Sequence, residues 1–288
     1  MATAVQSKIS NKYVTVEGLK TRYLDEGEGP VLLLLHGASL GSSADVFLRN
    51  IPPLVDAGFR AIAFDTPGFG LTDNPSDHSA AFRRNFIPKF MDALGLTKVA
   101  LVAHSQAGGT AVQLALATPE RYSHILVLGT GSLLPPLGAK GGEVREAAVQ
   151  QRLERRMAAS EPSIDDTRKL LEANLFHKEL ITDAELQLRH SMSVGKNFEA
   201  FVARQDAAEK APAKAAPAKA LWERLTELKV PLRLLYGRED RANAFERATL
   251  LKELRPQLDV HIVDGCKHLV PWDAADRVIS LGVPFLRG

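Results

Sequence analysis

A serine, an aspartate and a histidine, each just after an apolar run, are the residues of this chain best suited to chemistry. Ser105 follows the run KVALVAH, Asp240 lies in the loop GREDR, and His268 lies in the stretch CKHLV. A serine hydroxyl is a weak nucleophile at neutral pH, so it needs a base and an acid that orients the base. The chain order Ser, Asp, His supplies both partners. We therefore predict that Ser105 is the nucleophile, His268 its base and Asp240 the residue that orients His268.

The residues around Ser105 support this role. Small residues, Ala103 and Ala107, stand two positions to either side, an apolar run precedes the serine and a helical pattern follows it. A tight turn between a strand and a helix would push the hydroxyl out of the backbone, and such a turn is crowded. Both flanking residues are alanine where glycine is commonest, so the assignment rests on the strand before Ser105 and the helix after it.

Other acids and histidines compete for these roles. Glu239 is the alternative acid, although it can equally be a solvated loop charge. His104, next to Ser105, is expected to point away from it and to serve packing. The single cysteine, Cys266, is expected to be a small buried side chain. Three further histidines lie in a strand pattern or in a polar helical region: His261, His177 and His190.

Two backbone amides are expected to bind the negative oxygen that forms during attack on a carbonyl. Gln106 begins the helix after Ser105, at its positive dipole end. The loop HGASLGSS follows the buried run VLLLL, and its Ala38 offers the second amide. Gly37 and Gly41 in this loop allow the backbone to approach a ligand closely. We predict an oxyanion hole formed by Ala38 and Gln106.

Short apolar runs that alternate with helical patterns must position these residues. A hairpin is predicted at residues 12–24, with its turn at Glu17 and Gly18. Six runs follow: VLLLL (31–35), RAIAFD (60–65), KVALVAH (98–104), HILVLGT (124–130), PLRLLYG (231–237) and DVHIVDG (259–265). This alternation predicts an α/β fold, a mostly parallel sheet flanked by helices, with ligands at the carboxyl ends of the strands.

Residues 131–228 show helical periodicity and many charges in place of strand patterns. Examples are the stretches at 143–157, 164–176 and 183–194. We interpret 131–228 as a helical lid inserted between two parts of one core, residues 1–130 and 229–288. Within it, APAKAAPAKA at 211–220 is low in complexity, and its prolines favour an extended connector.

Composition limits the partners of this chain. Of 288 residues, 45% are hydrophobic and 24% charged, and a net charge of +2 gives no field that indicates nucleic acid. The longest apolar run is too short for a membrane span, the N-terminal stretch lacks the apolar core of a signal peptide, and one cysteine excludes an internal disulfide. We expect a cytoplasmic protein with a small-molecule substrate, no nucleic-acid or membrane partner, and no need for a metal or an organic cofactor.

Five motifs, in this order and spacing, resemble the α/β-hydrolase superfamily: HGASLGSSADVF, FDTPGFGLTD, AHSQAGG, YGREDR and KHLVPW. The likeness covers nearly the whole chain outside the predicted lid. Within the superfamily, the chain looks most like the serine hydrolases that cleave carbon–carbon bonds in meta-cleavage products of aromatic degradation. Their substrates are vinylogous 1,5-diketones that bear a carboxylate. The resemblance implies enol-to-keto tautomerisation, cleavage into a dienoate and a second acid, and a homodimer.

The resemblance also implies a substrate-binding role for Arg189. The stretch TDAELQLRHSMSVGKNFEAF resembles the family's lid helix, in which an arginine contacts the carboxylate or enolate of the substrate. A guanidinium binds a carboxylate in a two-pronged geometry that lysine cannot reproduce. Without the resemblance, Arg189 would be interpreted as a solvated helix charge.

Two positions differ from the pattern of many of these enzymes. His104 stands where they carry asparagine, and Leu269 where they carry tryptophan. The pair His-Ser at this turn is commoner among esterases, haloperoxidase-like enzymes and lactonases. The alternative to carbon–carbon cleavage is therefore hydrolysis of an ester or lactone through an acyl-enzyme.

A binding protein on the same scaffold is a third interpretation, which the complete set of Ser, Asp and His disfavours. Dehalogenases and epoxide hydrolases would place aspartate where this chain has Ser105.

Overall fold

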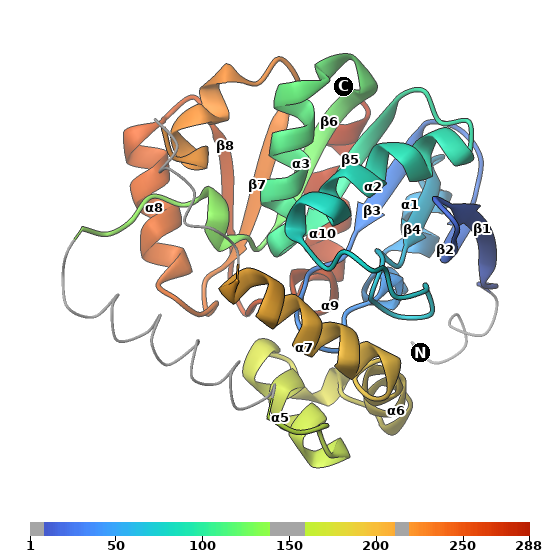
Figure 1. The fold of residues 1–288 in the computed structure, drawn as a ribbon. Coiled ribbons are helices and arrows are strands. Elements are labelled where there is room, and N and C mark those ends of the chain that lie inside the picture. Colours follow the sequence, from blue (N-terminus) through green and yellow to red (C-terminus); the bar gives the residue numbers. More distant parts are fainter. Residues whose placement is uncertain (1–8, 139–158, 211–218) are drawn as a thin grey trace.

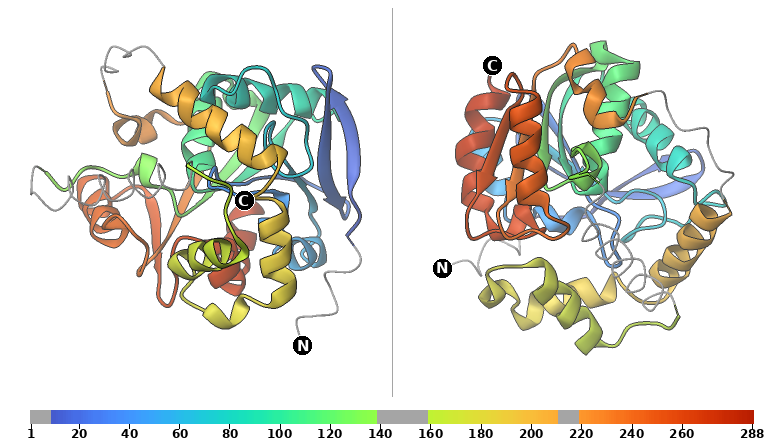
Figure 2. Two further views of the ribbon diagram at one scale, coloured as in Figure 1. Left: turned by 60° about the horizontal axis from the view of Figure 1, so that its bottom comes forward. Right: turned by 90° about the vertical axis from the view of Figure 1, so that its left-hand side faces the viewer.

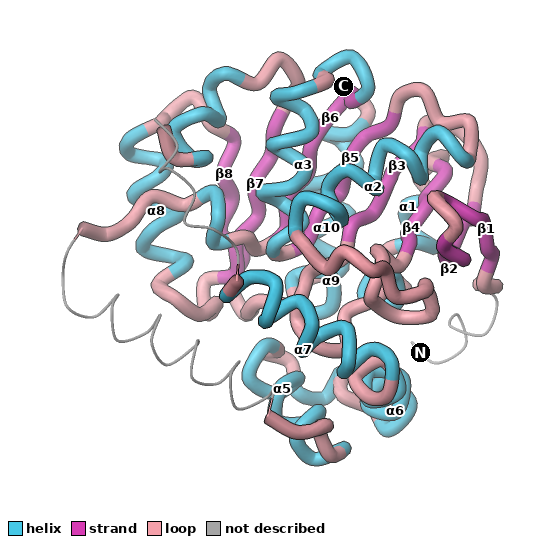
Figure 3. The backbone as a smooth tube through the Cα atoms, in the orientation of Figure 1, coloured by secondary structure: helices cyan, strands magenta, loops and turns pink. Residues whose placement is uncertain are grey.

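An eight-stranded sheet forms the centre of the computed structural model, which describes residues 9–138, 159–210 and 219–288. The strand order is β1-β2-β4-β3-β5-β6-β7-β8. The pairs β1–β2 and β2–β4 are antiparallel, and all other neighbours are parallel. The predicted α/β fold with a mostly parallel sheet is therefore confirmed, and Figure 3 shows the strands enclosed by helices.

The strands occupy the apolar runs that the sequence predicted. Their bounds are Lys12–Val16 (β1), Leu19–Glu26 (β2), Val31–Leu35 (β3), Arg60–Phe64 (β4), Val99–His104 (β5), Tyr122–Leu128 (β6), Leu232–Gly237 (β7) and Asp259–Val263 (β8). The predicted hairpin turn has positive φ at both Glu17 (51°) and Gly18 (79°), as type I′ turns require. The central strands are continuous apolar runs because both faces of the sheet are covered.

Helices cover both faces of the sheet and give the molecule three layers (Figures 1 and 2). One face carries α2 (Ala80–Ala93), α3 (Gln106–Ala117) and α8 (Ala244–Leu254). The other carries η1 (Ala44–Phe47), α1 (Ile51–Asp56), α9 (Val270–Asp273) and α10 (Ala275–Leu286). Successive strand residues point to opposite faces, so Leu33 belongs to one hydrophobic core and Leu34 to the other.

Between β6 and β7, the described part of the chain contains helices and no strand. The helices are α5 (Ile164–Asn174), α6 (Asp183–Ser191) and α7 (Lys196–Glu209), and the 3-10 turns are η3 (Gly131–Leu133), η4 (Lys178–Leu180) and η5 (Leu221–Glu227). A further turn, η2 (Pro119–Arg121), follows α3. We call residues 159–210 the helical insert. The predicted helix at 143–157 and residues 211–218 of the predicted connector lie outside the described residues.

The helical insert lies at the end of the sheet where the parallel strands finish (Figure 1). Its contacts show this directly. Arg189 Nη2 donates to Ser39 Oγ (3.0 Å) in the loop after β3, and Arg204 Nη1 donates to the Gly68 carbonyl (2.6 Å) in the loop after β4. The insert therefore covers the edge at which Ser105 emerges. Among the described helices, none has both the length and the apolar character needed to span a bilayer.

Candidate active site

Ser105 occupies a strained turn between β5 and α3. Its φ of 56° and ψ of −128° place it in a region that costs a non-glycine residue about 1–3 kcal/mol. Two backbone hydrogen bonds hold the turn, from Ser105 N to Leu128 O and from Gly108 N to Ser105 O, both 2.9 Å. The strand, turn and helix that the sequence predicted around Ser105 are therefore present.

Two glycines allow the backbone to close around this turn. A Cβ added to Gly37 would lie 3.0 Å from the Ser105 Cβ, and a Cβ added to Gly108 would lie 2.6 Å from Val127 Cγ1. Both distances are shorter than ordinary van der Waals contact. The loop after β3 can approach Ser105, and the start of α3 can approach the end of β6, only because these positions lack side chains.

Ser105, His268 and Asp240 form one hydrogen-bonded chain. Ser105 Oγ lies 2.9 Å from His268 Nε2, and His268 Nδ1 lies 3.1 and 3.2 Å from the two carboxylate oxygens of Asp240. An ionised carboxylate only accepts, so Nδ1 carries the ring proton and Nε2 is left to accept the serine proton. The three residues come from loops after β5, β7 and β8, and the structure brings them together as the sequence predicted.

The Asp240 carboxylate is held in place by its surroundings. Its side chain is buried, and Arg241 N donates to its Oδ1 (2.7 Å). His268 is held from the other side, because His104 Nε2 donates to the His268 carbonyl (2.9 Å). Burial, followed by the charge of His268, holds the pKa of His104 well below its ordinary value. His104 is therefore a neutral side chain that positions the His268 backbone, and it makes no hydrogen bond to Ser105.

The alternative acid, Glu239, has a different task. Its Oε2 accepts a hydrogen bond from Cys266 N (2.9 Å), and its own N donates to the Cys266 carbonyl (3.1 Å). Cys266 is buried, as predicted, and burial raises the pKa of its thiol. The three other histidines considered as candidates bond elsewhere: His261 to Asp259, His177 to Glu179 and His190 to Thr167.

The two amides predicted for the oxyanion hole line a common pocket of about 280 Å³. Gln106 is the first residue of α3, where a backbone N–H has no partner within the helix. The Ala38 amide makes no hydrogen bond with any described residue. Both N–H groups are therefore available to a ligand oxygen near Ser105. Within residues 9–138, 159–210 and 219–288, no three His, Cys, Asp or Glu side chains gather as metal ligands would.

His36 fixes the loop that carries Ala38. Its Nε2 accepts from Thr66 N (3.0 Å), so its Nδ1 carries the proton and donates to the Gly37 carbonyl (2.6 Å). Burial, together with the positive charges of three arginines, lowers the pKa of His36 to about 3. The ring is therefore neutral at physiological pH. His36 is the first residue of the loop HGASLGSS, but nothing in the sequence indicates this role.

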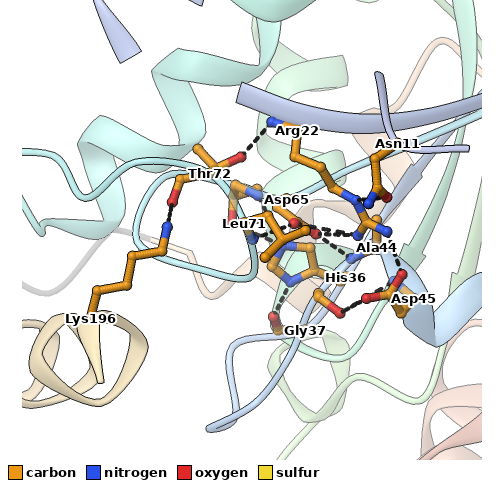
Figure 4. Close-up of polar contacts among 12 residues, drawn as sticks. Asn11, Arg22, His36, Gly37, Ala44, Asp45, Asp65, Leu71, Thr72 and Lys196 are labelled. Atoms are coloured by element: carbon orange, nitrogen blue, oxygen red, sulfur yellow. Dashed lines mark hydrogen bonds and ion pairs between the residues drawn. The ribbon is translucent and has the colours of Figure 1, made fainter. Parts of the chain in front are cut away.

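A buried ion cluster, missed by the sequence analysis, lies beneath the same loop (Figure 4). Arg22 donates to Asp65 (3.3 Å) and to Asp45 (2.6 Å), and Asp65 also accepts from the backbone amides of Ala44 and Leu71. The cluster ties the loops after β3 and β4 to the hairpin. Arg22 stands two residues before a core leucine in the same strand, so strand alternation could have shown that it faces inward.

Arg189 is 8% exposed and so is not the solvated helix charge that the sequence left open. Its Nη2 donates to Ser39 Oγ, and its Nε has no hydrogen-bond partner in the described part of the chain. Burial lowers its pKa to about 10. It forms no ion pair with any residue that the structure describes. A buried guanidinium without a carboxylate partner lies against the loop of the predicted oxyanion hole.

Comparison with known proteins places this chain in a family. Residues 30–275 match the family described as alpha/beta hydrolase fold. The chain is 30% identical to a 2-hydroxy-6-oxo-6-phenylhexa-2,4-dienoate hydrolase of Burkholderia cepacia, with 99% of each chain covered. It is 29% identical to a 2-hydroxy-6-oxononadienedioate/2-hydroxy-6-oxononatrienedioate hydrolase of Comamonas testosteroni, with 96% of each covered.

A solved structure gives the same result. The meta-cleavage product hydrolase from Pseudomonas fluorescens IP01 is 27% identical, with a TM-score of 0.75 and coverage of 97% of this chain and 98% of that one. The predicted resemblance to meta-cleavage product hydrolases is thus confirmed. The chain belongs to the α/β-hydrolase fold family.

Proposed function

We propose that this hydrolase uses Ser105, His268 and Asp240 as a catalytic triad to cleave a carbon–carbon bond in a vinylogous 1,5-diketone that carries a carboxylate. The observation that carries the proposal is the hydrogen-bonded chain of Ser105, His268 and Asp240, together with Arg189 against the loop after β3, a buried guanidinium with no carboxylate partner among the described residues. The names of two similar proteins, which are hydrolases of 2-hydroxy-6-oxo-dienoates, support the same substrate class.

The geometry suggests the role of each residue in the reaction. After the bound enol tautomerises to the ketone, His268 Nε2 takes a proton from Ser105, or from a water, and the released oxygen attacks the carbonyl carbon. The amides of Ala38 and Gln106 hold the negative oxygen, while Asp240 stabilises the imidazolium. When the carbon–carbon bond breaks, its electron pair passes to the dienolate fragment, which takes a proton from His268. If Ser105 was the nucleophile, the acyl group is now an ester of Ser105, and a water activated by His268 hydrolyses it to the second acid and free Ser105. Neither a metal nor an organic cofactor enters these steps.

Arg189 supplies the charge that this substrate class requires. Burying a guanidinium without a partner costs several kcal/mol, and an anionic ligand offsets that cost. The carboxylate or enolate end of the substrate would pair with its Nε and with Nη1, which make no hydrogen bond with any described residue. The predicted lid function of the helical insert, the homodimer and the cytoplasmic setting stay predictions.

Ester or lactone hydrolysis through an acyl-enzyme is the second candidate function, and His104 favours it. The chain carries His-Ser at the turn, a pair commoner among esterases, and the His104 ring is committed to the His268 carbonyl. In that position it does not offer the amide that asparagine brings in many carbon–carbon hydrolases.

One assay separates the two functions. A coloured dienolate meta-cleavage product and p-nitrophenyl esters are compared under the same conditions, with wild type and with Arg189→Gln. The proposal expects a preference for the dienolate and a loss of roughly 100-fold in kcat/KM in Arg189→Gln for that substrate only. Arg168→Gln, an exposed arginine on α5, is the matched control. A preference for esters, with normal activity in Arg189→Gln, would support the second function.

A further inference from the structure

Helix α7 of the helical insert contacts the loop after β4 through Arg204. This side chain is buried, and its Nη1 donates to the Gly68 carbonyl (2.6 Å). A Cβ added to Gly68 would lie 3.2 Å from the same nitrogen and 3.4 Å from Ala200 Cβ. The glycine therefore leaves the room that α7 needs to approach this loop.

The positive charge of Arg204 lies against the aromatic ring of Phe69. Arg204 Cζ is 3.8 Å from the centre of this ring. Burial, followed by the charge of Arg83, lowers the pKa of Arg204 to about 9, and no carboxylate in the described part of the chain pairs with it. A cation is attracted to the negative face of an aromatic ring, and the attraction grows when water is excluded. Arg204 is therefore held by the Phe69 ring and the Gly68 carbonyl, and it fixes the position of the ring in return.

Phe69 in turn packs against His36. The two rings meet edge to face, with their centres 4.9 Å apart and an angle of 62° between their planes. His36 Nδ1 donates to the Gly37 carbonyl (2.6 Å), as Figure 4 shows. This carbonyl and the N–H of Ala38 belong to the same planar peptide group and point in opposite directions. The hydrogen bond that orients the Gly37 carbonyl therefore also orients the Ala38 N–H.

These contacts connect the helical insert to the predicted oxyanion hole. Phe69, His36 and Ala38 all line the pocket of about 280 Å³, whereas Arg204 is not among its lining residues. Arg204 can therefore influence the orientation of the Ala38 amide without touching a ligand in this pocket.

We infer that Arg204 is a positioning residue that holds the Ala38 amide in the oxyanion hole through Phe69 and His36. The inference rests on the proposed function, from which it takes Ser105 as the nucleophile and Ala38 as an oxyanion donor. It gives the helical insert a part in the chemical step: α7 must lie against the loop after β4 for the oxyanion hole to be complete.

Docking of the insert alone is the competing interpretation of Arg204. Two other hydrogen bonds join α7 to the same loop without involving Phe69. Asn74 Nδ2 donates to the Lys196 carbonyl (2.8 Å), and Lys196 Nζ donates to the Thr72 carbonyl, as Figure 4 shows for the second pair. Asn74→Ala removes the first of these hydrogen bonds and leaves Arg204 on the ring. This variant is therefore the matched control for docking.

Arg204→Met keeps the length of the side chain and removes its charge and its hydrogen bond. We expect kcat/KM for p-nitrophenyl acetate and the rate constant of labelling by a fluorophosphonate to fall roughly 3- to 30-fold, because both reactions form a negative oxygen beside Ala38. Arg204→Lys keeps a cation near the ring and should recover part of the loss. Asn74→Ala should match wild type. In a Phe69→Leu background, Arg204→Met should cause little further loss, since the ring it acts through is already absent.

Two matched inhibitors separate positioning from general loosening of the site. A trifluoromethyl ketone adds to Ser105 and forms an oxyanion beside Ala38, whereas the corresponding trifluoromethyl alcohol cannot add. Arg204→Met should raise the inhibition constant of the ketone by the same factor as the loss in kcat/KM and leave that of the alcohol unchanged. An equal rise for both inhibitors, or an equal loss of kcat/KM in Asn74→Ala and Arg204→Met, would show that Arg204 only docks the insert and would overturn the inference.

The outcomes distinguish this inference from the proposed function. Unchanged kcat/KM in Arg204→Met, with a wild type that cleaves the dienoate, rejects the inference alone. If wild type hydrolyses p-nitrophenyl acetate and no dienoate, the carbon–carbon assignment fails, and the same variants still decide the inference on the ester. A wild type that a fluorophosphonate does not label would reject both, because Ser105 would then not be the nucleophile.

Discussion

Ser105 adopts a backbone conformation that a serine holds only when its neighbours enforce it. The surrounding strand and helix supply the enforcing hydrogen bonds, and Gly37 supplies the space on the other side of the hydroxyl. In this conformation Ser105 Oγ lies 2.9 Å from His268 Nε2. Backbone strain of this kind is often found at functional sites, which fits the proposed role of Ser105.

Replacing Ser105 by alanine removes the proposed nucleophile and should leave the turn intact. We expect turnover to fall by about 10⁴-fold or more, while the coloured dienolate still binds. A fluorophosphonate probe should label wild type and fail to label Ser105→Ala. Ser191→Ala, a surface serine on α6, is the matched control and should be labelled normally. An unlabelled wild type would favour the binding-protein interpretation, and unchanged turnover in Ser105→Ala would reject the nucleophile.

Some features of single residues were predictable from the sequence, and others depend on contacts that form only on folding. The hydrogen-bonded chain of Ser105, His268 and Asp240 was predictable because chain order and the ends of strands are local signals. The choice of Asp240 over Glu239 depends on Cys266, 27 positions further along, whose amide engages the glutamate. The burial of Arg189 depends on a loop 150 positions earlier. Such contacts exist only in the folded chain, so a charged residue on a polar helix gives no sign of them.

At the scale of elements, Asp273 of α9 joins the helical insert to the loop that carries His268. Its buried carboxylate accepts hydrogen bonds from Phe176 N (2.8 Å), His177 N (3.0 Å) and Lys267 N (2.8 Å). Leu269 N also donates to the Asn174 carbonyl at the end of α5 (3.0 Å). His268 therefore lies between Lys267, whose amide donates to Asp273, and Leu269, whose amide donates to the insert.

Asp273→Asn tests this junction with a side chain of the same shape. One carboxylate oxygen becomes an NH₂ group that faces backbone donors, so the junction should loosen and His268 should lose its alignment. We expect kcat to fall roughly 10- to 100-fold, since small displacements of catalytic groups are costly. The rate of labelling by a fluorophosphonate should fall with it. Asp264→Asn, an exposed aspartate in the preceding loop, is the control. Wild-type labelling in Asp273→Asn would exclude the positioning role.

At the scale of the whole molecule, the apolar pattern predicted the sheet and its layers better than it predicted the polar interior. Continuous apolar runs and alternating helices require a covered parallel sheet, and that is what the structure shows. The cluster of Arg22, Asp45 and Asp65 follows no such pattern, because its members come from three separate elements. It holds the loops after β3 and β4 together beneath the site.

This cluster should make stability depend on pH. Burial raises the pKa of Asp65 to about 6, against the opposing charge of Arg22. The ordinary value is near 4, so the folded state keeps a proton that the unfolded state loses between about pH 4 and pH 6. The contribution of Asp65 to stability is therefore full below about pH 4 and is lost as the pH rises through 6. Removing Arg22 would raise this pKa further.

Arg22→Met should lower the free energy of unfolding by roughly 3–5 kcal/mol at pH 7.5, because it leaves two buried carboxylates without their cation. The deficit relative to wild type should shrink towards pH 5, where Asp65 takes up a proton. Urea unfolding at both pH values measures this deficit in the free energy of unfolding.

Arg60→Met is the control. Arg60 pairs with Asp25 near the surface, so the loss of Arg60 should lower the free energy of unfolding by less than about 1 kcal/mol. Arg60 lowers the pKa of Asp25, which leaves that carboxylate ionised at both pH values, and the control deficit should stay constant. A deficit in Arg22→Met that is equally constant would show that Asp65 does not titrate in this range.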